Sequence, residues 1–113
     1  MSTLFLEQAK PPEYDSTSLE FIKCLVEKRV GGTLVDPTAD VVKMAFTLTK
    51  TGTGATFYNA DWETTSTGYY VRCLVGPGGG TTTLVAGNVY YVWVKITDSP
   101  EAPVKPGGLL AVT

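Results

Sequence analysis

The chain has 113 residues, 43% of them hydrophobic, and a formal net charge of -2. This length suits one domain that buries about two-thirds of the surface its unfolded chain would expose. Charged residues are scattered, so there is no basic stripe for nucleic acid, and no apolar run approaches a membrane span. Threonine, valine, tyrosine and glycine dominate over typical helix formers, so we expect a soluble all-β domain without nucleic-acid or membrane partners.

Residues 1–17 are predicted to form an extended N-terminal arm that precedes a domain at 18–113. Pro11-Pro12 favours extended backbone and cannot donate hydrogen bonds to a central ladder. One interpretation is an edge strand with a linker. The other is an arm that docks on a neighbouring subunit through Leu4, Phe5 and Leu6. The opening residues also lack the basic and apolar regions of a secretion signal, so we expect synthesis in the cytosol.

The first long strands are predicted at 19–28 and 41–50, separated by turns at Gly31-Gly32 and Asp36-Pro37-Thr38. In the first strand Ile22, Cys24 and Val26 share one face, because strand side chains alternate with period two. The second strand alternates most cleanly. Its predicted inward residues are Val42, Met44, Phe46 and Leu48, and its predicted outward residues are Lys43, Ala45, Thr47 and Thr49.

A weaker strand is predicted over 55–62, where Phe57 and Trp62 have opposite parity, which indicates a bulge or a break. Alternation returns at 68–75. Tyr69, Val71, Cys73 and Val75 are predicted inward, and Tyr70 and Arg72 outward. The loop 76–83 is predicted to lead the chain into the following turn and strand, and its glycine-rich part, 76–80, reads as a flexible hairpin loop. It lacks the Lys-Ser/Thr of a phosphate-binding loop, and Pro77 removes one amide.

The strongest fold signal is the run from Leu84 to Thr97. Its opening pattern Leu84, Gly87, Tyr90 matches a tyrosine corner, in which glycine permits the turn and the tyrosine hydroxyl bonds back to the corner's backbone. A long strand follows, with Tyr90, Val92, Val94 and Ile96 on the core face. Residues 98–108 are predicted to be a proline-stiffened connection, and 109–113 the closing strand.

Seven or eight strands without a helix, together with the tyrosine corner, predict an immunoglobulin-like antiparallel β-sandwich. The chain has no histidine and only two cysteines, so the commonest general base and the usual metal ligands are missing. We therefore expect no enzyme activity, cofactor, metal or small-molecule substrate. Cys24 and Cys73 are predicted to be buried and reduced rather than disulfide-bonded.

The candidate contact residues are aromatic. If Tyr90 and its neighbours form the core, Tyr91 and Trp93 face outward together, and Tyr70 joins them from another strand. Clustered tyrosine and tryptophan are typical of interface hot spots. The alternative is that the N-terminal arm or the 98–108 connection of the same chain covers them.

Three segments carry a resemblance: 36–46 (DPTADVVKMAF), 69–79 (YYVRCLVGPGG) and 92–104 (VWVKITDSPEAPV). The chain resembles small virion proteins of tailed bacteriophages, particularly those of actinobacterial hosts, over roughly residues 19–113. It is more loosely similar to the immunoglobulin-like N-terminal domain of phage baseplate upper proteins. The resemblance implies a structural role in the particle, as a capsid decoration or a head-to-tail or neck component assembled in the host cytoplasm.

The resemblance implies other virion proteins as partners, and a second copy of the chain is also possible. Two other interpretations remain open. The domain could be a binding module that recognises a carbohydrate or a host-surface ligand through its exposed aromatic residues. It could also be an infection-stage regulator that binds a host protein.

Overall fold

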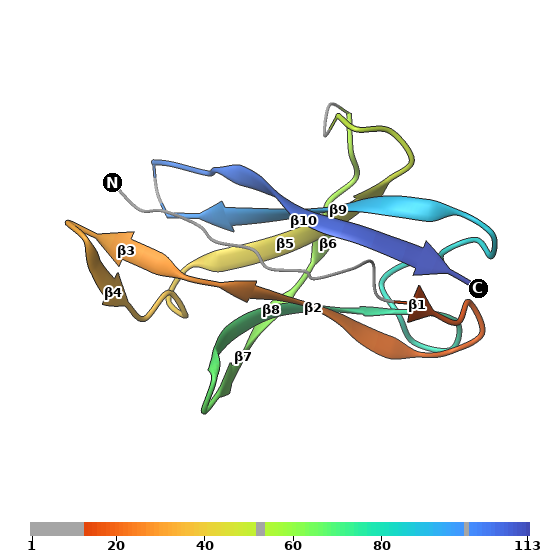
Figure 1. Ribbon diagram of the computed structural model, residues 1–113, viewed down its shortest axis with the longest axis horizontal. Coiled ribbons are helices and arrows are strands. Elements are labelled where there is room, and N and C mark those ends of the chain that lie inside the picture. Colours follow the sequence, from red (N-terminus) through yellow and green to blue (C-terminus); the bar gives the residue numbers. More distant parts are fainter. Residues whose placement is uncertain (1–12, 52–53, 99) are drawn as a thin grey trace.

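The computed structural model describes residues 13–51, 54–98 and 100–113. This part of the chain contains ten strands in three sheets and no helix, so the predicted all-β class is confirmed (Figure 1). None of its segments is a helix long and apolar enough to cross a membrane. The strand number exceeds the predicted seven or eight because several short strands flank the long ones.

The two larger sheets face one another across the core (Figure 1). In spatial order, the five-stranded sheet comprises β1 (Glu13–Tyr14), β10 (Val104–Val112), β9 (Val89–Thr97), β5 (Val41–Thr47) and β6 (Tyr58–Asn59). The three-stranded sheet comprises β2 (Glu20–Val26), β8 (Gly68–Val75) and β7 (Asp61–Thr65). All pairs in these sheets are antiparallel except β1 with β10.

Strand β9 lies at the centre of the larger sheet, and its side chains alternate between buried and exposed positions as predicted. Its inward residues are Tyr90, Val92, Val94 and Ile96. They pack against inward residues of the opposite sheet, namely Ile22, Cys24, Val26, Val71, Cys73 and Val75. The sheets curl around this core as a half-barrel. Because both sheets bury one face only, their strands keep the period-two pattern that the sequence displays.

Strand β5 corrects one assignment, that of Leu48, and shows an outward residue, Ala45, that is nevertheless buried. Leu48 was predicted inward but is 60% exposed, because β5 ends at Thr47 and the alternation no longer applies beyond it. Ala45 was predicted outward and does lie on the outer side, opposite Trp93, yet it is fully buried. The large Trp93 indole covers the small Ala45 methyl group and excludes water from it.

Of the bulge or break predicted within 55–62, the structure has a break, at residue 60. The chain leaves the five-stranded sheet after β6 and joins the three-stranded sheet at β7. Ala60 still donates its amide to Val42 at 3.3 Å. Beyond the break, the Trp62 indole donates to the carbonyl of Asp40 at 2.9 Å. Tyr58, Ala60 and Trp62 all pack against the core, whereas Phe57 lies beside Lys95 of the outer face, which accounts for the opposite parity of Phe57 and Trp62.

The closing strand is longer than predicted, because β10 begins at Val104 and not at Leu109. Its register shifts between Pro106 and Gly108, which is where a proline without an amide proton is tolerated in a sheet. Gly107 allows the backbone to approach the core closely. A Cβ there would lie 3.0 Å from the Cys24 sulfur. Because Pro106, Gly107 and Gly108 are typical of loops, the sequence of this part of β10 predicts a loop where the structure has a strand.

Strand β1 supports the edge-strand interpretation for part of the predicted arm. Glu13 and Tyr14 pair in parallel with Ala111 and Val112. Tyr14 is buried, and its hydroxyl donates to the carbonyl of Ser18. The arm's predicted anchor, Leu4, Phe5 and Leu6, lies outside the described residues.

The stretch 76–80 is not a hairpin loop, because it begins the connection from β8 of one sheet to β9 of the other. Gly76 donates its amide to Thr82 at 2.9 Å and accepts one from Gly80 at 3.1 Å. Gly76 also has a φ of +119° and abuts the β1–β2 connection. The connection is therefore held by hydrogen bonds within it and by its close packing against the β1–β2 connection.

The hairpin of β3 (Lys28–Val30) and β4 (Thr33–Val35) forms its own small sheet. Lys28 attaches it to the larger sheet, since its ammonium lies 2.7 Å from Asp40 and 3.1 Å from Asp98. The hydrogen bond with Asp40 is the main reason that the pKa of Lys28 is raised. Contacts of this kind fix how the hairpin sits against the domain.

The predicted hydrogen bond of the corner is present. The Tyr90 hydroxyl accepts the backbone amide of Val85 at 3.0 Å, Leu84 is buried, and Gly87 has a φ of +88°. Gly87 also donates its amide to the carbonyl of Val112 at 2.8 Å. The corner thus joins the start of β9 to the end of β10.

We expect Tyr90→Phe to lower the free energy of unfolding by about 1 kcal/mol, since it leaves the Val85 amide unpaired and also removes the longer hydrogen bond from the Asn88 side chain at 3.5 Å. Urea denaturation measures this change. Tyr70→Phe is the matched control, because the Tyr70 hydroxyl bonds to Thr67 at the exposed surface. Equal losses for the two variants would contradict the structural role of the corner.

Cys24 and Cys73 are buried as predicted and are free thiols. Burial raises the pKa of Cys24 to about 12 and also raises that of Cys73. Only the thiolate reacts readily with alkylating agents. We expect both thiols to resist iodoacetamide at pH 8 in the native protein and to react in denaturant, as mass spectrometry can measure. Rapid native labelling of Cys24 would overturn the assignment.

The same shift gives a pH dependence with a definite sign. The unfolded state releases the Cys24 proton near pH ~8.5, whereas the folded state holds it to about 12. The contribution to stability is therefore complete below pH ~8.5 and is lost as the pH rises toward 12. The free energy of unfolding should therefore fall more steeply with pH in the wild type than in Cys24→Ala, and only in this alkaline range. Urea denaturation of both proteins at a series of pH values measures the difference.

Candidate functional site

The candidate site is the outer side of the five-stranded sheet, which we call the aromatic face. It consists of side chains that alternate with the core residues of β5, β9 and β10. Its members are Lys43, Ala45, Thr47, Val89, Tyr91, Trp93, Lys95, Leu109 and Ala111. Tyr91 and Trp93 lie on it together as predicted, and both are half-buried. Val89 at the start of β9 is 49% exposed.

Trp93 is held in place. Its indole nitrogen donates to the Thr47 hydroxyl at 2.9 Å, and Thr47 lies on the neighbouring strand, opposite Tyr91. Trp93 is itself directly opposite Ala45, whose small side chain leaves room for the indole. An aromatic residue fixed in this way loses little conformational entropy when a partner binds, which is a property of interface anchors.

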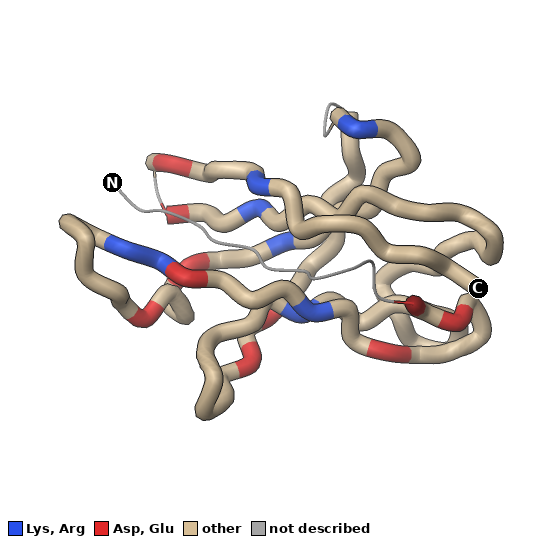
Figure 2. The backbone as a smooth tube through the Cα atoms, viewed as in Figure 1, with Lys and Arg blue, Asp and Glu red and all other residues tan. Residues whose placement is uncertain are grey.

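One end of the aromatic face is cationic. Lys43 of β5 is directly opposite Lys95 of β9. The Lys95 ammonium lies 5.4 Å from the centroid of the Phe57 ring. Figure 2 shows basic segments on three successive strands at this end of the sheet. Strands β5, β6, β9 and β10 contain no aspartate or glutamate.

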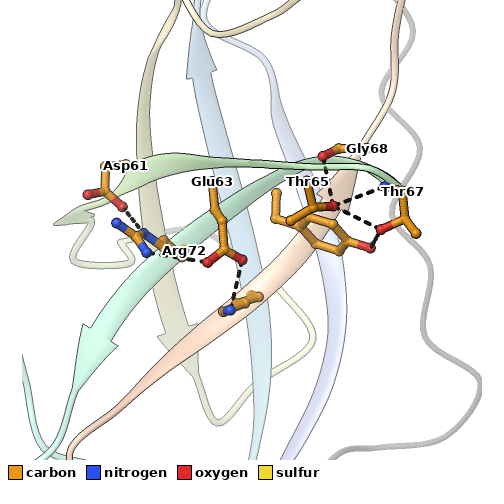
Figure 3. Close-up of polar contacts among 8 residues, drawn as sticks. Asp61, Glu63, Thr65, Thr67, Gly68 and Arg72 are labelled. Atoms are coloured by element: carbon orange, nitrogen blue, oxygen red, sulfur yellow. Dashed lines mark hydrogen bonds and ion pairs between the residues drawn. The ribbon is translucent and has the colours of Figure 1, made fainter.

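The outer side of the three-stranded sheet has a different character, because its charges are mutually neutralised. Figure 3 shows Asp61 and Glu63 pointing at Arg72. The Arg72 Nε lies 2.8 Å from Asp61, and Glu63 lies 3.4 Å from Arg72 and 2.8 Å from Lys23. Arg72 also stacks over Phe21, 4.3 Å from the ring centroid. The side chains thus form a self-contained ion network.

Tyr70 does not join Tyr91 and Trp93. It lies on β8, opposite Leu25 and Glu63, so it belongs to the outer side of the other sheet. Its hydroxyl bonds to Thr67 at 3.0 Å. Outward residues of facing sheets point in opposite directions, which separates Tyr70 from the aromatic face by the thickness of the domain.

With this geometry established, the chain was compared with known proteins. Protein-family models, curated proteins and solved structures gave no match.

The described residues contain no group of three or more side chains suited to hold a metal ion. The closest pair of carboxylates on the ion network, Asp61 and Glu63, is bound by Arg72 and Lys23. The surface that remains available for recognition is the aromatic face.

Sequence reasoning found the aromatic residues of this face but missed its cationic end and the ion network opposite. Lys43 and Lys95 are 52 positions apart, and only the register of β5 against β9 makes them neighbours. The ion network could have been suspected from charges at alternate positions within 61–65 and from the predicted outward position of Arg72.

Proposed function

We propose that this chain is a structural protein of a tailed-bacteriophage virion, a capsid decoration or a head-to-tail or neck component. It acts through protein–protein contacts with neighbouring virion subunits and is assembled in the host cytoplasm. It has no catalytic role. The resemblance of residues 36–46, 69–79 and 92–104 to small virion proteins supports this proposal. The observation that carries it is the aromatic face, with Trp93 fixed by Thr47.

We further propose that the domain is an immunoglobulin-like sandwich. The order β2-β8-β7 in one sheet and β10-β9-β5-β6 in the other supports this class. So does the Tyr90 corner at the start of β9. In such a sandwich each sheet packs one face on the core and turns its other face outward. Here the five-stranded sheet supplies the apolar outer face, and the three-stranded sheet supplies the charged one.

A face of this kind can act in a symmetric assembly, in which many copies of the subunit make the same contact. Closed symmetry multiplies a modest interface, so the assembly gains avidity without a large contact on each subunit. An apolar patch with polar neighbours and fixed aromatic residues is typical of such contacts.

Mass spectrometry of purified virions tests the proposal, and the copy number would separate capsid decoration from a neck ring. Recombinant protein should also bind particles that lack it. Val89→Glu places a charge on the aromatic face and should abolish this binding. Leu34→Glu, an equally exposed site on the β3–β4 hairpin, should not. Absence of the protein from virions would refute the proposal.

The alternative of a carbohydrate or host-surface module depends on the same aromatic residues. Tyr91 and Trp93 stand two positions apart on β9, a spacing of about 7 Å that stacked sugar rings could use. Binding on a glycan array that is lost in Trp93→Ala would favour this alternative. If no glycan on the array binds, the result favours the virion role over carbohydrate recognition.

A further inference from the structure

Two pairs of like-charged side chains stand directly opposite each other in this domain. Lys23 is opposite Arg72 in the three-stranded sheet, and Lys43 is opposite Lys95 in the five-stranded sheet. Like charges at opposed positions on one face of a sheet repel each other. Each pair therefore favours a counter-charge.

The first pair obtains its counter-charge from within the chain. Glu63 contacts Lys23 with one carboxylate oxygen and Arg72 with the other. A single carboxylate thus bridges two cations on adjacent strands (Figure 3). This arrangement shows the geometry that satisfies an opposed cation pair on a sheet of this protein.

The second pair has no such carboxylate among the described residues. Among the described residues, Lys23, Lys28, Arg29 and Arg72 have a carboxylate within ion-pair distance, whereas Lys43, Lys50, Lys95 and Lys105 have none. Of these four lysines, Lys43 and Lys95 stand directly opposite each other. The strands around the pair, β5, β6, β9 and β10, carry no acidic residue. The place that Glu63 fills on one sheet has no counterpart on the other.

Apolar side chains continue from this pair along the same face. Trp93 is two positions from Lys95, and Tyr91 and Val89 follow at the same spacing. A ligand that satisfied the lysines would therefore also cover an apolar strip. A strand-like protein segment matches this layout, because its side chains on one side repeat at the same interval.

We propose that the aromatic face docks an extended protein segment whose carboxylate bridges Lys43 and Lys95 while its neighbouring apolar side chains cover Trp93 and Tyr91. This inference names the chemistry of the partner and rests on the proposed function in taking this face as the docking surface. A net charge of -2 and only two opposed lysines favour a protein carboxylate over a nucleic-acid backbone.

The test is an NMR titration of the full chain with two matched probes. The peptide Ser-Leu-Ser-Leu-Ser-Glu-Ser-Glu places leucine and glutamate on one side when extended, and its control replaces glutamate with lysine. We expect the acidic peptide to shift the amide resonances of Lys43, Trp93 and Lys95 and to bind at least about tenfold more tightly than the basic one. Added salt should weaken it.

Charge reversal sharpens the result. Lys43→Glu/Lys95→Glu should invert the preference between the two peptides, whereas Arg29→Glu/Lys50→Glu, with the same change of net charge but away from this face, should keep it. Equal binding of both peptides, or no shifts on the aromatic face, would overturn the inference. So would preferential binding of oligothymidine, which would assign the face to nucleic acid.

The outcomes separate this inference from the proposed function. Presence in virions with no peptide preference would refute the inference alone. Absence from virions with a clear, invertible preference would refute the virion role and leave the partner chemistry standing.

Discussion

Replacing Gly76 by alanine is expected to destabilise the domain by about 3–5 kcal/mol. A Cβ at this position would lie 2.0 Å from the Ser18 carbonyl oxygen and 2.7 Å from the Tyr14 hydroxyl oxygen. The clash involves backbone, so it cannot be relieved by rotating a side chain. The φ of +119° adds strain for any residue with a Cβ. Against a total stability of about 5–15 kcal/mol, such a loss would unfold much of the protein on mild heating.

Gly78→Ala is the matched control for this prediction. Gly78 lies in the same connection with a φ of +88°, but a Cβ there would meet nothing within 4 Å. Its substitution should cost only the backbone strain, about 1–2 kcal/mol. Urea denaturation of the two variants measures the difference. If they lose equal stability, the contact between Gly76 and the β1–β2 connection does not exist.

Met44→Ala is expected to cost about 2–5 kcal/mol, because Met44 is fully buried between the two sheets and its truncation leaves a cavity. Leu48→Ala provides the comparison. The two residues share the predicted inward parity of 41–50, yet Leu48 is 60% exposed, so its truncation should change stability by less than about 0.5 kcal/mol. Thermal denaturation distinguishes the outcomes. A large loss for Leu48→Ala would place the end of β5 further along the chain.

The parts of the fold that the sequence predicted are those where one side of a strand is buried. Alternation at 89–97 and 68–75 gave the inward residues of β9 and β8, since a period-two pattern survives whenever only one face packs. It failed at Leu48 because periodicity does not mark where a strand ends. It failed over 104–108 because Pro106, Gly107 and Gly108 make a bulged strand look like a loop.

The residues of the candidate site were predicted only in part, because their prediction also depended on alternation within single strands. Parity within one strand tells inward from outward, so Tyr91 and Trp93 were correctly placed together. It does not tell which layer a strand joins, and Tyr70 was therefore grouped with residues of the opposite sheet. The opposition of Lys43 and Lys95 depends on strand register, which is set by long-range packing and is not visible in either strand alone.

The pairing of β1 with β10 has a kinetic consequence. It unites residues as far apart as Tyr14 and Thr113, which are 99 positions apart in sequence and also share a hydrogen bond. To form contacts of such long range, the chain must first close a long loop, and the entropy lost in closing it opposes folding before the contacts add stability. Folding of this domain should therefore take milliseconds to seconds, and the parallel edge should be acquired late, after the hairpins on either side of the core have formed.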